Sequence, residues 1–126
     1  MNESCQHAGI VQERVYRFVL WLMPAVDKFP RSQKFLLGDR IQSLALEVLE
    51  GLVGATYTRE RRPILTRVNL HLEKLRVLLR LAKDLRHLDL RRYEHAVEEL
   101  NEVGRLVGGW LKAGRPPTEA GAAAAV

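Results

Sequence analysis

The stretch LTRVNLHLEKLRVLLRLA, residues 65–82, decides the fold of this chain. Its apolar residues recur at alternating steps of three and four, which places them on one face of an α-helix. Leu78, Leu81 and Leu85 widen that face toward a second neighbour. Pro63 suits the first turn of this helix, where its missing N–H has no partner to lose. The residues on the main face are Leu65, Val68, Leu72, Leu75, Leu79 and Ala82.

Three further segments repeat the helical pattern. The first covers residues 11–29, with a kink expected at Pro24 and an end at Pro30. The second covers residues 33–58, with Ser32 as its N-cap, and the last covers residues 92–112, with Asp89 as its cap. The expected core residues of these helices are Val11, Val15, Phe18, Leu22 and Val26; Leu37, Ile41, Leu44, Val48, Leu52 and Ala55; and Ala96, Leu100, Val103, Val107 and Trp110.

Four such helices joined by short connections predict an all-α fold, an up-down-up-down antiparallel four-helix bundle. The bundle is expected to cover residues 11–113, between a flexible N-terminus (1–10) and a disordered alanine-rich tail (114–126). The second helix contains Gly38, Gly51 and Gly54, which predict close approach of a neighbouring helix.

Composition limits the class of protein. A chain of 126 residues can bury one core, and no stretch is apolar enough to span a membrane. The lone Cys5 cannot form an internal disulfide, and the first residues lack a secretion signal. We therefore expect one soluble, cytoplasmic domain.

No pattern typical of an enzyme or a metal site is present. No Glu precedes a His by three residues, as the di-iron sites of helical bundles require, and the four histidines lack a zinc-ligand spacing. Nucleophile elbows and glycine-rich phosphate loops are also missing. We expect no catalytic residue, metal or cofactor.

The positive charge is concentrated in the middle of the chain. Residues 59–92 hold eleven Lys or Arg and four Asp or Glu, whereas residues 1–58 are balanced. Arg76, Arg80, Lys83 and His87 follow helical steps that align them in one strip, a spacing suited to several phosphates. The alternative is a solvated helix face. Tyr57, Tyr93 and Trp110 are expected to pack rather than to stack on bases.

The fourth helix carries Gly104-Arg105-Leu106-Val107-Gly108-Gly109-Trp110, which resembles the Gly-Arg-x-x-Gly-x-Trp signature of the accessory variability determinant (Avd) family of diversity-generating retroelements. Phe29-Pro30-Arg31 and Leu75-Arg76-Val77-Leu78-Leu79-Arg80 resemble further motifs of that family, within a wider group of bundles related to ribosomal RNA intervening-sequence proteins. The resemblance covers roughly residues 11–113.

The resemblance implies a non-enzymatic homopentamer that binds the retroelement's reverse transcriptase and nucleic acid, RNA or DNA, in support of mutagenic reverse transcription and retrohoming. It assigns binding first to Arg76, Arg80 and Arg105. The alternative is a structural or adaptor bundle that acts through protein contacts alone. The remaining candidate binding residues are Arg59, Arg61, Arg62, Arg67, Lys74, Lys83, Arg86, Arg91 and Arg92.

Overall fold

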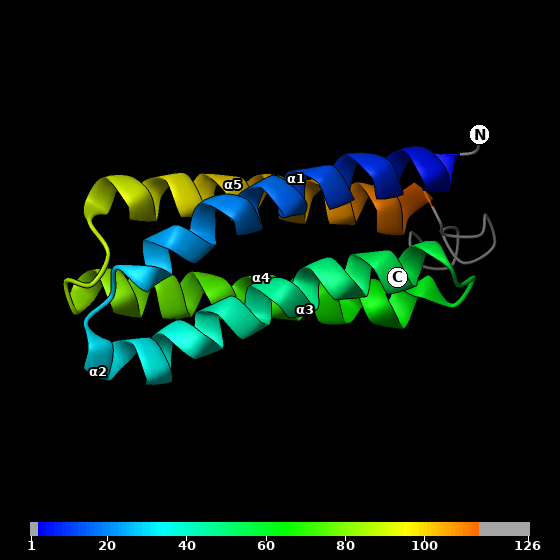
Figure 1. The fold of residues 1–126 in the computed structure, drawn as a ribbon. Coiled ribbons are helices and arrows are strands. Elements are labelled where there is room, and N and C mark those ends of the chain that lie inside the picture. Colours follow the sequence, from blue (N-terminus) through cyan, green and yellow to red (C-terminus); the bar gives the residue numbers. More distant parts are fainter. Residues whose placement is uncertain (1–2, 114–126) are drawn as a thin grey trace, which may run out of the picture.

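The computed structural model describes residues 3–113, and of residues 3–5 only the backbone. Within this range the chain forms helices and connections and no strand, so the predicted all-α four-helix bundle is confirmed (Figure 1). The elements are α1 (Glu3–Asp27), the short α2 (Arg31–Gln33), the π-helix η1 (Lys34–Gly38), α3 (Asp39–Thr56), α4 (Arg61–Asp84) and α5 (Leu90–Ala113).

Each long helix packs against two others. α3 contacts α1 and α4, and α5 also contacts α1 and α4. In Figure 1 each long helix is followed by one that returns along the bundle. The connections that follow α1 and α4 therefore lie at one end, and the α3–α4 connection lies at the other.

The core is apolar, and among the described side chains no polar or charged residue is buried. The periodicity predicted it well, since every residue of the four main stripes is buried except the half-buried Leu44. Of the residues expected to widen the α4 face, Leu78 is half-buried, but Leu81 and Leu85 are 45% and 47% exposed, so the prediction is wrong for these two. Trp110 is the largest of the fully buried side chains. None of the described helices has a run of residues long and apolar enough to cross a bilayer.

The ends of several helices differ from the expected positions. α1 begins at Glu3 rather than Val11, because Ala8 continues the buried stripe by one more step toward the N-terminus and is only 3% exposed. Residues 3–10 are therefore helical and extend the expected bundle toward the N-terminus, while residues 1–2 and the tail 114–126 lie outside the described residues. α1 continues through Pro24, and α4 begins at Arg61.

The segment after α1 departs most from prediction. Pro30, not Ser32, occupies the N-cap position of α2, and no side chain caps that helix. η1 then gives a widened turn that buries Leu37 and Gly38 and leaves Phe35 68% exposed. π-turns of this kind are frequent at functional sites.

Two of the three glycines mark close contacts, as predicted. A Cβ at Gly38 would lie 3.0 Å from Cγ1 of Val26, and a Cβ at Gly51 would lie 2.9 Å from Cγ2 of Val68. Gly54 has open space around it, so the prediction of close packing is wrong there.

Candidate nucleic-acid interface

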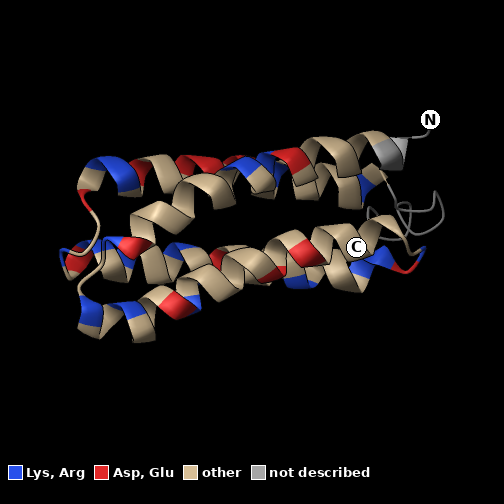
Figure 2. Ribbon diagram, viewed as in Figure 1, with Lys and Arg blue, Asp and Glu red and all other residues tan. Residues whose placement is uncertain are grey.

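Helix α4 divides the basic segment 59–92 between the two ends of the bundle. Arg59 and Arg61 lie at the α3–α4 connection, whereas Arg86 and Arg91 lie at the α4–α5 connection. The 24 residues of α4 span about 36 Å at the rise of an α-helix. The basic residues of this one segment of sequence therefore lie on two separate surfaces (Figure 2).

Arg76 connects α4 to α5. Its Nε donates to Oδ1 of Asn101 at 3.0 Å, and its Nη2 donates to the carbonyl of Leu100 at 3.2 Å. Its Nη1 pairs with Glu73 at 3.0 Å, and the side chain is 26% exposed. Since these contacts engage all three guanidinium nitrogens, they give Arg76 a structural role, and its binding to an acidic partner stays a prediction.

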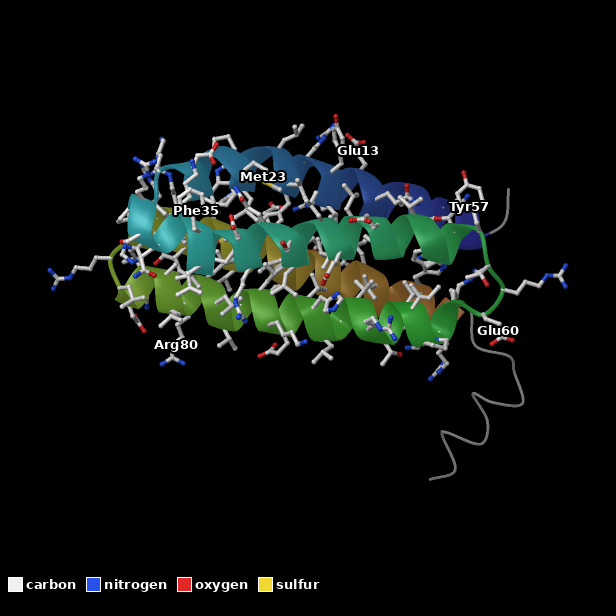
Figure 3. The ribbon with its side chains drawn as sticks, turned by 60° about the horizontal axis from the view of Figure 1, so that its bottom comes forward. Glu13, Met23, Phe35, Tyr57, Glu60 and Arg80 are labelled. Carbon is white, nitrogen blue, oxygen red and sulfur yellow. The ribbon has the colours of Figure 1, made fainter. Side chains whose placement is uncertain are left out.

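The strip expected on α4 is not an open basic face. Lys83 lies 4.8 Å from the ring centre of Tyr93, and the His87 ring lies 5.8 Å from that of Phe29. Arg80 is the outward member, with its side chain 72% exposed and a long 3.9 Å approach to Asp84 (Figure 3).

The other candidates on the long helices are spread out. Arg67 and Lys74 are exposed on α4, and Arg62 is exposed in its first turn. Arg105 is exposed on α5, where both its Nε and Nη2 donate to Glu102. That hydrogen bond lowers the pKa of Glu102 from its ordinary value and raises that of Arg105.

The fold brings basic residues from two distant parts of the sequence together in one cluster. The Phe29–His87 ring contact joins the α1–α2 connection to the α4–α5 connection, and Lys and Arg residues lie on both connections and on the turns beside them (Figure 2). We call this cluster the basic end; it holds nine basic and four acidic residues. The basic residues are Lys28, Arg31, Lys34, Arg40, Arg80, Lys83, Arg86, Arg91 and Arg92, and the acidic residues are Asp27, Asp39, Asp84 and Asp89.

The acidic residues of the basic end neutralise only some of its cations. Asp27 pairs with Lys34 at 3.5 Å, Asp84 pairs with Lys83 at 3.2 Å, and Asp89 pairs with Arg92. Within residues 3–113, no hydrogen bond or ion pair engages the side chain of Arg40, on α3, or the side chains of four cations at the connections, two from each. These four, which we call the unpaired cations, are Lys28, Arg31, Arg86 and Arg91.

Asp89 fixes the start of α5 as predicted. Its Oδ1 accepts the backbone N–H of Arg92 at 2.8 Å, which satisfies a donor that the first helical turn leaves free. This hydrogen bond is the main reason that the pKa of Asp89 lies below its ordinary value. The cap therefore stabilises the fold at neutral pH, and its contribution is lost as the pH falls through the lowered pKa.

Arg86 has the backbone conformation that favours glycine. Its φ is 67°, and it is the one described non-glycine residue with a positive φ. The N–H of His87 donates to the carbonyl of Ala82, and that of Arg86 donates to the carbonyl of Lys83. These two bonds form the Schellman motif that ends many helices, in which the position of Arg86 is usually glycine.

Replacing Arg86 by glycine is therefore expected to raise the free energy of unfolding by about 0.5–1 kcal/mol. A residue with a side chain pays about 1–2 kcal/mol for the left-handed conformation, and glycine avoids this cost. Glycine also gives the unfolded chain more conformational freedom, which offsets about 0.4–1 kcal/mol of the stabilisation. Urea denaturation measures the change. Arg86→Ala is the control, because it removes the same guanidinium and keeps the left-handed cost; an equal gain in both variants would contradict the explanation.

The predictions for the three aromatic residues had different outcomes. Trp110 is fully buried and Tyr93 is half-buried against the core, as expected. Tyr57 is 86% exposed, so the prediction that it packs is wrong. Its ring lies beyond the end of α3, where none of the helices described within residues 3–113 covers it.

The sequence missed Lys28 and Arg31 as site residues, because only the folded bundle brings them beside Arg86 and Arg91. It also missed an apolar groove between η1, the start of α3 and α4. Phe35, Leu36, Leu44, Val77 and Leu78 line this groove, whose charged lining residues are Asp39, Arg40, Glu47, Glu73 and Lys74.

Fold and surface together define the class: a small helical bundle with a basic cluster at one end and an open apolar groove beside that cluster. The family model described as bAvd-like matches residues 9–114, so the chain belongs to the bAvd-like family. This confirms the resemblance to Avd proteins, and membership suggests an accessory protein of diversity-generating retroelements. Comparisons with curated proteins and with solved structures give no match.

Proposed function

We propose that this protein is a non-enzymatic accessory factor of a diversity-generating retroelement. In this proposal it binds the element's reverse transcriptase and nucleic acid, and it supports mutagenic reverse transcription and retrohoming in the cytoplasm. The observation that carries the nucleic-acid part is the set of unpaired cations at the basic end. Cations that form no ion pair within the protein are available for phosphates to neutralise, with release of counterions.

The proposal extends to protein partners. Phe35 and Leu36, 68% and 60% exposed, lie with Val77 on the groove beside the basic end. Exposed apolar grooves with charged margins are typical of protein contact sites. We assign this groove to contacts with the reverse transcriptase or between copies in a homopentamer.

Binding of single-stranded RNA and DNA to the purified protein tests the nucleic-acid part. Contacts with about four phosphates predict that the logarithm of the binding constant falls with that of the salt concentration at a slope near −3 for a single strand. Affinity is then expected to fall about 60-fold between 50 and 200 mM salt. Fluorescence anisotropy with labelled oligonucleotides measures the slope, and co-purification with the reverse transcriptase tests the protein part.

The alternative is an adaptor bundle that acts through protein contacts alone, and the apolar groove favours it. It predicts no detectable oligonucleotide binding even at low salt, with retention of the reverse-transcriptase complex. That result would reject the nucleic-acid part of the proposal while leaving the family assignment in place.

A further inference from the structure

Tyr57 has the most exposed of the large apolar side chains described, at 86%. It follows the last residue of α3, at the end of the bundle opposite the basic end. Figure 3 shows its side chain directed away from the helices. An exposed aromatic ring forgoes the free energy of burial, and no packing against residues 3–113 compensates for this cost.

The ring is carried by a well-anchored connection. The backbone N–H of Tyr57 donates to the carbonyl of Gly54 at 3.1 Å, and Oγ1 of Thr58 accepts the N–H of Glu60 at 3.1 Å. Arg61 donates to the carbonyl of Thr58 from Nε at 3.3 Å and from Nη2 at 3.2 Å, while its guanidinium lies 5.8 Å from the ring centre of Trp110. A ligand that stacks on Tyr57 would therefore order little of the protein.

Positively charged residues follow Tyr57 closely in the sequence. Arg59, two residues beyond Tyr57, is exposed and has no hydrogen-bond or ion-pair partner among the described side chains. Arg62 is exposed in the first turn of α4. Glu60 is the acidic residue of this connection, and Figure 3 shows it on the side away from Tyr57. An exposed aromatic ring next to cations is the combination that holds single-stranded nucleic acid, because the ring stacks on a base and the cations meet phosphates.

We propose that Tyr57 stacks on an unpaired base of single-stranded RNA or DNA, with Arg59 at an adjoining phosphate. This site is separate from the basic end, and it rests on the nucleic-acid part of the proposed function. In a duplex both faces of each internal base are already stacked, so the ring favours single strands. The proposal therefore restricts the preferred ligand to nucleic-acid strands with unpaired bases.

The test uses two labelled single strands of about ten nucleotides, oligothymidine and an abasic strand of equal length and charge. Tyr57→Leu is expected to weaken binding of oligothymidine about tenfold, in the range that loss of one stacked base gives, and to leave abasic binding unchanged. Tyr57→Phe keeps the aromatic face and is expected to bind as the unaltered protein does. Tyr16→Leu, which removes another exposed tyrosine ring, on α1, is the matched control.

Arg59→Gln separates charge from stacking. It is expected to weaken both strands equally and to lower the salt slope by about 0.7, the value for one phosphate on a single strand. Failure of the unaltered protein to bind either strand overturns the nucleic-acid function and this site together. Equal binding of the two strands, or a Tyr57→Leu effect on both alike, overturns the stacking site alone. A change in the molar mass of the assembly in Tyr57→Leu also overturns it, because the ring would then be a subunit contact.

Discussion

Replacing Trp110 by alanine is expected to lower the free energy of unfolding by about 3–5 kcal/mol, the usual cost of deleting a buried large aromatic side chain. Trp110 is 0% exposed and lies on the buried face of α5. The substitution leaves a cavity and also removes the ring beneath the Arg61 guanidinium. Since small domains have about 5–15 kcal/mol of stability in total, much of the margin would be lost. Urea denaturation followed by circular dichroism measures the change.

Trp110→Phe is the matched variant for this prediction. Phenylalanine keeps an aromatic face for Arg61 and most of the apolar contact, so its cost is expected to be less than half that of alanine. A loss below about 1 kcal/mol in Trp110→Ala would show that the end of α5 packs more loosely than the structure describes.

Removing all four unpaired cations is expected to weaken nucleic-acid binding at about 100 mM salt by two to three orders of magnitude. The variant is Lys28→Gln, Arg31→Gln, Arg86→Gln and Arg91→Gln combined. Each cation that meets a phosphate releases a counterion, so the salt slope should also become less negative by about 2.8, which is about 0.7 for each of the four contacts. Anisotropy titrations at several salt concentrations measure both quantities.

Paired substitutions distinguish a site from overall charge. Two double variants each remove the unpaired cations of one connection: Lys28→Gln with Arg31→Gln, and Arg86→Gln with Arg91→Gln. Both are expected to lower the affinity for nucleic acid by similar factors. Arg14→Gln with Arg17→Gln removes the same charge from α1, where Glu99 and Glu13 already pair with these residues. An equal loss in this control would contradict the basic end as the binding surface.

The sequence predicted the bundle because burial in a helix repeats with a local period. The stripe from Leu65 to Ala82 follows that period without a break, and each of its members is buried. The same rule did not reveal the widened turn of η1, although Leu37 within it was correctly expected in the core. It also underestimated α1, because Ala8 is too small to stand out as a core residue.

The candidate site was less predictable, because charge along a chain does not say where side chains meet. Arg76 looks like part of a basic strip, and only the position of α5 reveals that Asn101 and Leu100 engage it. Arg31 lies outside the basic segment 59–92, and the return of α4 to the same end brings Arg86 and Arg91 into its neighbourhood. An up-down order of helices would have placed the first and third connections together, so this part of the site had a signal in the topology.

Gly104 and Arg76 belong together. A Cβ at position 104 would lie 3.2 Å from Nη2 of Arg76, so the glycine of the α5 signature provides clearance for the arginine of α4. Two motifs that read as separate binding elements thus form one size-complementary pair. We therefore expect a larger residue at 104 to push the Arg76 side chain away from the carbonyl of Leu100, and to be accepted more readily when residue 76 is also shortened.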